Sequence, residues 1–519
     1  MVQVGFMPII AEVSSTSLLV VAITVIAFAG AVVVALRPAS SPHFATLRSA
    51  PPVLADDRYL RPEPPQMRWL ENGVLFIVAG YILFDRPFAW IHVPGTPLFI
   101  GETIIALGIW VLLSTRSGVA SLIRSSSSLK ALRNFMLWGL VLLAIGILPW
   151  GLDAIRDSAI WYYGVIAIFA AMLLVSDPSR VSIWLVRFAR LLPIYLIWFP
   201  FATVLVRVAP PNLYVPDSNI PVFFHRSGNM AVMSAIGIAF LWMADGDSKF
   251  FSPRQRAALT TLATVVIVFT GLQNRGGMVA SVVLIAALMF MLSKRRVEMV
   301  MMMIAVLVFA GAIGIIFNVK IELFDDRDVS IEQFANNITS IFNQDEGGQR
   351  QTETTEWRLK IWTQVLDDVS NESPVMGFGM GPDLGARYGI STEEETPLRN
   401  PHNSHVGVLA RTGWLGAILW VILWITWMAE MQTLRRRLRY RNRPRESAVV
   451  SWIMLAPIPI LVNCIFDPTL EGAQVAMVLW AFYGVGAALI ILAQHNRFPS
   501  LATTTWDNTA QRRVTARRS

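Results

Sequence analysis

The sequence predicts an all-α polytopic membrane protein of about 12–13 transmembrane helices, with one long, partly helical loop on the outer (periplasmic or extracellular) side. The chain has 519 residues, 54% of them hydrophobic and only 15% charged, and a mean hydropathy of +0.53. Soluble domains carry about a quarter charged residues, so this composition excludes an ordinary soluble enzyme. Thirteen apolar stretches approach the ~20 residues that cross a ~30 Å hydrocarbon core. They are residues 17–36, 70–84, 97–114, 134–150, 158–175, 191–207, 229–244, 257–273, 277–293, 297–317, 405–429, 448–466 and 473–493.

The basic residues predict the orientation. Thirty of the 43 Lys and Arg residues fall in alternate loops and in the C-terminal tail. The positive-inside rule therefore places the N-terminus outside and the C-terminus inside. The net charge of +8 is then a topology signal and no indication of nucleic-acid binding. The single cysteine, Cys464, excludes a disulfide framework and a cysteine-based metal site.

Five regions follow from this pattern. Residues 1–69 hold an N-terminal span and a basic linker, and the span is not predicted to be a cleaved signal peptide because no Lys or Arg precedes it. Residues 70–317 form a transmembrane bundle and residues 405–493 the last transmembrane helices. Residues 494–519 form a basic tail that we expect to be disordered.

The outward segment 318–404 is too long for a plain connector, since loops above about 15 residues are usually functional or disordered. It carries seven basic and sixteen acidic residues. From Thr354 to Val369 its apolar residues fall on one face of a helix, so the segment is predicted to be partly ordered.

Arg275 lies in a tight turn between two predicted spans, followed by Gly276 and Gly277. A fixed cation beside the free N–H groups of a helix start suits a phosphate, and the glycines let a ligand approach the backbone. The alternative is that Arg275 reaches lipid headgroups and that the glycines only make the turn.

Arg358 is predicted to emerge from the middle of the apolar stripe of the helix in the long loop, beside Trp362 and Val365. A charge there is costly unless it is paired or meets an anion. An ion pair with a loop carboxylate is the alternative to ligand binding.

His402 precedes the span that starts near His405, and Asn403 or Ser404 can cap that helix. The positive end of the helix dipole favours the neutral ring, which can act as a base. His405, about one turn on, competes for this role, and an interfacial histidine without chemistry is the remaining alternative.

Two further arginines lie outside the predicted cytoplasmic loops, so the positive-inside rule does not explain them. Arg411 lies inside a predicted span, where a charge indicates function unless it reaches the surface, and Arg226 heads an outward helix start. Asp326 and Asp328 have the spacing of some sugar-nucleotide metal sites, but acidic loops produce such a pair by chance, and no metal site is predicted. No Walker loop, zinc helix motif or nucleophile elbow is present.

Several motifs, in this order and on this side of the membrane, resemble the O-antigen ligase and polymerase superfamily over roughly residues 70–490. They are the Arg275-Gly276 turn, Arg358-Leu-Lys-Ile-Trp362, Pro374-Val-Met-Gly377-Phe-Gly379-Met-Gly381, Pro401-His402-Asn403 and Gly413-Trp-Leu-Gly416. The span 17–36 is additional to the usual twelve of the ligases.

The resemblance implies a glycosyltransferase of cell-surface polysaccharide (lipopolysaccharide) biosynthesis. Such proteins move a glycan from undecaprenyl diphosphate to a hydroxyl of a glycan, lipid or protein acceptor, with inversion and without metal or other cofactor. It implies that His402 activates the acceptor and that Arg275 and Arg358 bind the diphosphate. Arg226, Arg411, Asn403 and Gly276 are candidates from the residue chemistry.

Two other interpretations stay open. One is a transporter or flippase of a lipid-linked sugar or another anion, although the notable charges gather at one face rather than deep in several spans. The other is a peptidoglycan-type polymerase. The sequence does not decide between a ligase and a polymerase.

Overall fold

The computed structural model describes most of the predicted bundle and part of the long loop. Over the described residues the chain is helical, with only two isolated β-bridges, which agrees with the predicted all-α fold. The predicted span 17–36, most of span 297–317 and the Asp326–Asp328 pair lie outside the described residues. Those described are residues 65–93, 98–114, 118–208, 213–216, 218–245, 250–271, 274–292, 296–298, 300–301, 304–305, 349–389, 399–499 and 501.

Seven helices of this described part are long and apolar enough to cross a membrane, so the chain is a multi-pass membrane protein. An eighth span forms if α6 and α7 are taken together with α8, from which they are bent by 42°. The seven are α2 (Pro65–Ala89), α5 (Ser127–Trp150), α9 (Arg180–Val208), α10 with the π-helix η3 (Ser227–Ala239 and Phe240–Ala244), α18 (Ser404–Tyr440), α19 with α20 (Pro444–Leu455 and Pro457–Asn463) and α21 (Ala473–Gln494). The other helices are α3 (Ile100–Ser114), α4 (Val119–Arg124), α6 (Leu152–Asp157), α7 (Ala159–Tyr162), α8 (Val165–Ser176), α12 (Pro253–Gly271), α13 (Arg275–Met291), α16 (Gln349–Glu372) and α17 (Leu384–Tyr388).

The helix lengths refine the predicted spans. The stretch 70–84, which is short for a span, is the middle of the 25-residue α2. The stretch 405–429 is the first part of α18. At 1.5 Å per residue the 37 residues of α18 would extend about 55 Å, which is longer than the thickness of the hydrocarbon core. The stretch 448–466 is divided between α19 and α20.

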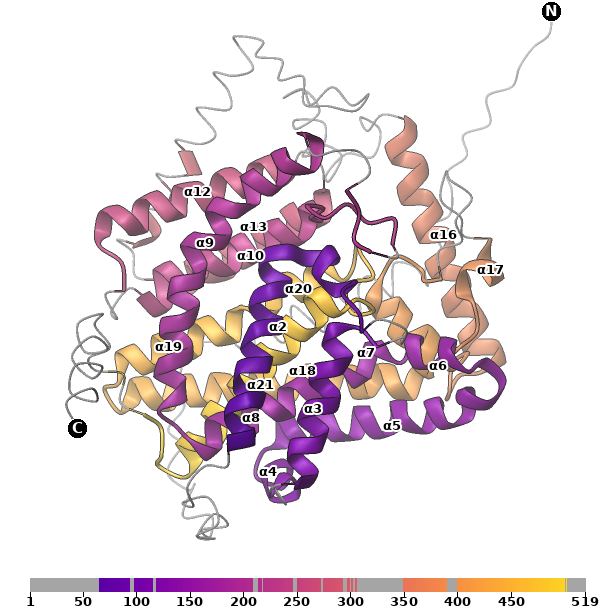
Figure 1. The fold of residues 1–519 in the computed structure, drawn as a ribbon, viewed down its shortest axis with the longest axis horizontal. Helices are drawn as coiled ribbons and strands as arrows, with labels where there is room; N and C mark the ends of the chain where they lie inside the picture. Colours follow the sequence, from indigo (N-terminus) through magenta and orange to yellow (C-terminus); the bar gives the residue numbers. More distant parts are fainter. Residues whose placement is uncertain are drawn as a thin grey trace, which may run out of the picture.

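The core lies where α21 packs along α8 and against α2. Almost all of the apolar part of α21 is buried, and Trp480 and Tyr483 are fully enclosed. The indole of Trp424 stacks on Trp480, and that of Trp427 stacks on Tyr483, which joins α18 to the same core. Figure 1 shows α16 and α17 at the end of the bundle that also carries α6 and α7.

The segment after α16 inserts into a break in α18. Gly413 leaves the helical conformation (φ 65°, ψ −172°), so nearby backbone groups of α18 find partners in residues 374–378. The Phe378 N–H donates to the Ala410 carbonyl (2.7 Å), and the Trp414 N–H donates to the Pro374 carbonyl (2.7 Å). The glycine motif that follows α16 therefore contacts α18 at Gly413, and this contact is called the loop–α18 crossing.

Gly377→Ala is expected to destabilise the protein through this crossing. Gly377 has φ 64°, and a Cβ there would lie 2.5 Å from the Ala410 carbonyl oxygen. We expect about 1–2 kcal/mol of backbone strain and about 1–3 kcal/mol of overpacking. Gly379→Ala is the matched control, because Gly379 also has positive φ (76°) but open space around it. Thermal denaturation of the detergent-purified variants checks this, and equal melting temperatures would contradict the packing argument.

Candidate active site

The starts of α10 and α13 lie side by side and carry two of the candidate arginines. Arg226 is the N-cap residue of α10, and Arg275 is the first residue of α13. A Cβ on Gly277 would lie 2.6 Å from the Cα of Gly228, so the two helix starts touch. Gly276 packs in the same way against the side chain of Phe466, where a Cβ would approach to 2.6 Å. In this structure both glycines serve helix packing.

Asp467, in the loop between α20 and α21, lies at the centre of a cluster formed with Arg226, Arg358 and His402. Its carboxylate is 3.7 Å from the Arg226 guanidinium, and its charge acts on both Arg358 and His402. The loop is fixed to the start of α18, because the Ser404 hydroxyl donates to the Asp467 carbonyl (3.1 Å) and the Ser404 N–H to the Cys464 carbonyl (2.8 Å). Asp467 thus joins three elements that are distant in sequence.

Of the two expected caps, Asn403 and Ser404, Asn403 is the one that caps α18. Its side-chain oxygen accepts hydrogen bonds from the backbone N–H groups of His405 (2.9 Å) and Val406 (3.1 Å). This cap forces the chain to turn sharply just before the helix, which places the preceding residue, His402, at the helix start.

His402 is held in an unusual backbone conformation by α16. Its φ of 53° lies in the left-handed region, which costs a non-glycine residue of the order of 1 kcal/mol and is found most often at functional sites. The Trp362 indole donates to the Pro401 carbonyl (2.8 Å), and the Trp357 ring lies 6.1 Å from the His402 ring. The loop helix therefore positions the histidine directly.

The His402 ring is neutral near pH 7. Burial lowers its pKa from 6.5 to about 4, assisted by the positive charges of Arg358 and Arg226 and opposed by Asp467. The prediction of a neutral ring agrees with this pKa, although burial is the largest cause. The Nδ1 atom is buried and has no hydrogen-bond partner in the described part of the chain.

His405, the competing histidine, is already engaged on both ring nitrogens. Its Nε2 lies 2.9 Å from the Leu461 carbonyl, and its Nδ1 lies 3.2 Å from the Trp420 indole nitrogen. A ring that donates through Nε2 and accepts through Nδ1 satisfies both contacts. His405 thus joins α18 to α20 and has no free nitrogen for a substrate, which leaves His402 as the candidate base.

Arg358 emerges from the apolar face of α16 as predicted. Ile361, Val365 and Val369 on that face pack against Val406 and Leu409 of α18. Burial lowers the pKa of the Arg358 guanidinium, and its Nε is buried without a hydrogen-bond partner among the described residues. A buried guanidinium with an unused donor beside His402 suits an anionic ligand.

Arg411 lies apart from this cluster. Its guanidinium is 2.9 Å from the Asp157 carboxylate and donates to the Pro382 carbonyl (2.6 Å) and the Arg399 carbonyl (3.4 Å). These contacts tie α18 to α6 and to the residues after α16. The structure thus brings Arg226, Arg358 and His402 together around Asp467 and places Arg275 at the neighbouring start of α13. Arg411 instead holds the residues that follow α16.

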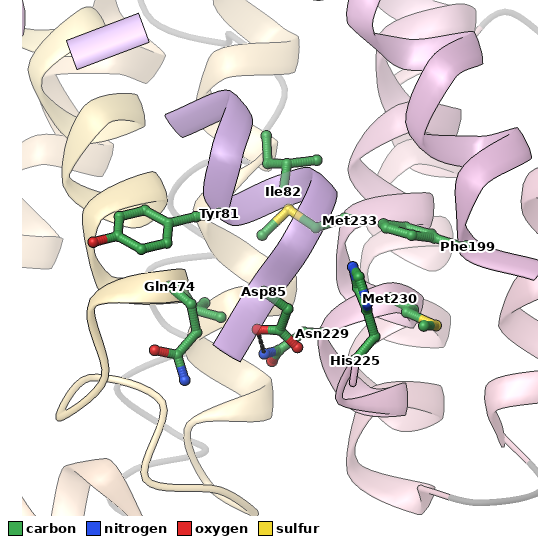
Figure 2. A pocket seen from close by; sticks show the side chains of 10 residues that line it. Tyr81, Ile82, Asp85, Phe199, His225, Asn229, Met230, Met233 and Gln474 are labelled. Carbon is green, nitrogen blue, oxygen red and sulfur yellow. Dashed lines mark hydrogen bonds between the residues drawn. The ribbon is translucent and has the colours of Figure 1, made fainter. Parts of the chain in front are cut away.

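The sequence reasoning missed Asp85 as well as Asp467. Asp85 ends the regular part of α2 with φ 46°, and its carboxylate accepts from the Arg226 N–H (2.7 Å) and the Asn229 amide (2.9 Å). Figure 2 shows Asp85 facing Asn229, with His225 and Gln474 on the walls of the same small pocket. The sequence did offer a signal for Asp85, because Asp85 and Arg86 stand together at the outward end of the predicted span 70–84.

We expect Asp85→Ala to weaken the site indirectly. The substitution leaves the Arg226 N–H and the Asn229 amide buried without their acceptor, which costs about 1–3 kcal/mol. The melting temperature should fall and glycan transfer should drop about tenfold. Asp367→Ala, an exposed acid on α16, is the control and should change neither quantity. Unchanged transfer in Asp85→Ala would show that Arg226 needs no such support.

Residues 258–421 match the family described as O-antigen ligase. Over this segment, about a third of the chain, the protein is similar to the O-antigen ligases. The matched segment begins inside α12, ends inside α18 and contains Arg275, Arg358 and His402. The comparison with curated proteins gives no match. The match supports an O-antigen ligase-like function in cell-surface polysaccharide assembly.

No group of three or more His, Cys, Asp or Glu residues is arranged to hold a metal ion within the described ranges. The positively charged side chains beside His402 are those of Arg226 and Arg358.

Proposed function

We propose that this protein transfers a glycan from a polyprenyl diphosphate to an acceptor hydroxyl on the outer face of the cytoplasmic membrane, with inversion at the anomeric carbon. The observation that carries the proposal is the neutral, buried His402 beside Arg358 and Arg226 at the start of α18. One side of such a site can take up a proton, and the other can take up a developing negative charge.

His402 acts as the base in this mechanism. The acceptor oxygen forms a bond to the anomeric carbon while the hydroxyl proton moves to an imidazole nitrogen. A positioned general base contributes about 10²–10⁴ in rate. Asp467 lies where it stabilises the imidazolium that results, since its charge already favours the protonated ring.

The arginines take up the charge on the leaving group. The bond between the anomeric carbon and the diphosphate breaks, and the electron pair leaves with the polyprenyl diphosphate. Arg226 and Arg358 supply positive charge beside His402, Arg275 adds a cation at the neighbouring helix start, and Asp467 and Asp85 offset part of this charge. These guanidinium groups are suited to the negative charges of a diphosphate diester. The guanidinium groups remain protonated and pair with phosphate oxygens in a bidentate manner.

Release of polyprenyl diphosphate tests the proposal. Purified protein in vesicles with a synthetic polyprenyl diphosphate glycan and an acceptor should liberate the diphosphate carrier only when the acceptor is present. Movement of intact donor across the bilayer without release would favour a flippase instead.

The pH dependence of transfer should report the low pKa of His402. The ring must be neutral to act as a base, so this group keeps transfer constant from pH 8 to pH 6 and lowers it only as pH falls toward 4. Glu471 accepts from the Asn400 side chain, and burial raises its pKa to about 7, so Glu471→Gln is the control that removes a second titration. An acid limb near pH 6.5 that persists in Glu471→Gln would contradict a buried, neutral His402.

A further inference from the structure

The chain that leads into α18 is anchored by side chains from two different helices. The Arg399 carbonyl accepts from the guanidinium of Arg411 in α18 (3.4 Å). The Pro401 carbonyl accepts from the Trp362 indole of α16 (2.8 Å). These two contacts fix the backbone on both sides of Asn400, so the side chain of Asn400 starts from a defined position.

Asn400 connects this anchored chain to His402. Its side-chain oxygen accepts a hydrogen bond from the His402 backbone N–H (3.1 Å), which forms an Asx turn. The turn fixes the direction of that N–H and stabilises the left-handed backbone of His402 (φ 53°). The amide nitrogen of the same side chain donates to the Glu471 carboxyl group. One amide thus connects Glu471 to the backbone of the candidate base.

Glu471 is itself held in place. It precedes Gly472, the N-cap residue of α21, and the apolar part of that helix is almost entirely buried. A Cβ on Gly407 of α18 would lie 3.1 Å from the Glu471 Oε1 atom, so the carboxyl group lies against α18. The positive charge of Arg411 and the N-terminal end of α21 both favour an acid there. Glu471 can therefore hold the Asn400 amide in one orientation.

The contact with Asn400 needs an acceptor oxygen and does not need a negative charge. Burial raises the pKa of Glu471 to about 7, opposed by the charge of Arg411 and assisted by that of Asp157. Neutral and ionised forms are therefore both present near pH 7, and each has an oxygen that accepts. A glutamine at this position also offers one acceptor oxygen. Glutamine is thus the conservative replacement for Glu471, and alanine is the one that removes the contact.

We propose that Glu471 is a positioning residue for His402 and acts through the side chain of Asn400. This role rests on the proposed function, in which His402 is the base. The Glu471 carboxyl group holds the Asn400 amide, and the oxygen of that amide holds the His402 N–H. The imidazole is thereby kept where it takes up the acceptor proton. Glu471 and Asn400 act through His402 and contact neither the donor nor the acceptor.

The transfer rates of two single variants and of their combination test this proposal, measured with the purified full chain in vesicles. Glu471→Ala and Asn400→Ala should each lower the rate at saturating donor and acceptor about tenfold, which is the effect of one lost hydrogen bond. The KM values should stay unchanged, because neither residue contacts a substrate. The double variant should also lose about tenfold, because both substitutions break the same connection. A loss of about a hundredfold in the double variant would show two independent effects and would overturn the proposal.

Two further variants separate positioning from a general effect of charge. Glu471→Gln keeps the acceptor oxygen and should recover most of the rate. Asp153→Ala removes an exposed acid 3.6 Å from the Arg399 guanidinium and leaves Asn400 untouched, so its rate should be unchanged. A loss in Glu471→Gln as large as that in Glu471→Ala would overturn the proposal, and so would an equal loss in Asp153→Ala.

Hydrogen–deuterium exchange gives a readout that does not depend on glycan transfer. The peptide that contains His402 should exchange faster in Glu471→Ala and in Asn400→Ala than in the unmodified protein, because the His402 N–H loses its fixed acceptor. Unchanged exchange in both variants would overturn the positioning role even if transfer fell. Faster exchange in both variants of a protein that transfers no glycan would support the connection and contradict the proposed function alone.

Discussion

His402→Asn is expected to reduce glycan transfer by about 10²–10⁴-fold, because it removes the base that takes the acceptor proton. Asparagine tolerates the left-handed backbone better than most residues, so the φ of 53° at this position can be kept. The loss should appear in the rate constant at saturating donor and acceptor, measured with purified protein in vesicles.

The comparison with alanine separates chemistry from folding. His402→Ala loses the same base but also strains the backbone at positive φ, so it should transfer as slowly as His402→Asn and melt at a lower temperature. Transfer by His402→Asn within tenfold of the unmodified protein would rule out His402 as the base.

Arg358→Gln is expected to lower transfer by about 10²–10³-fold, the cost of removing one preorganised donor from a developing anion. Arg358→Lys keeps the charge but loses the planar guanidinium group. Its transfer rate should therefore lie between those of the unmodified protein and Arg358→Gln. Because Arg358 lowers the pKa of His402, Arg358→Gln should also move the acid limb of the pH profile upward.

Lys360→Gln is the matched control for this prediction, because Lys360 is an exposed cation two residues along the same helix. Its transfer rate and pH profile should be unchanged. A loss of transfer in Lys360→Gln as large as that in Arg358→Gln would show that the net charge of α16 matters and that no specific phosphate contact is made.

Local patterns were enough to predict several parts of the site. The apolar stripe of α16 predicted both the helix and the place of Arg358 on its buried face. The two candidate caps, Asn403 and Ser404, predicted the start of α18. Each of these features depends on residues within a few turns of one another. The same local reasoning left His402 and His405 as competitors.

Contacts between distant segments decided the rest. The engagement of His405 depends on Leu461 and Trp420, and the pairing of Arg411 depends on Asp157, more than 250 residues earlier in the chain. Asp467 lies more than 100 residues beyond Arg358 in the sequence, yet its charge acts on that guanidinium. An apolar span also gave no sign that Gly413 would break α18, since the break is stabilised by the inserted residues 374–378.

Mass spectrometry of the reaction product tests the central claim most directly. Purified protein in vesicles is given an isotopically labelled polyprenyl diphosphate oligosaccharide and a hydroxyl acceptor. The account predicts an acceptor whose mass has increased by the whole labelled glycan, together with free polyprenyl diphosphate, and neither product with His402→Asn. A donor that stays intact with the unmodified protein, or an equal yield with His402→Asn, would contradict it.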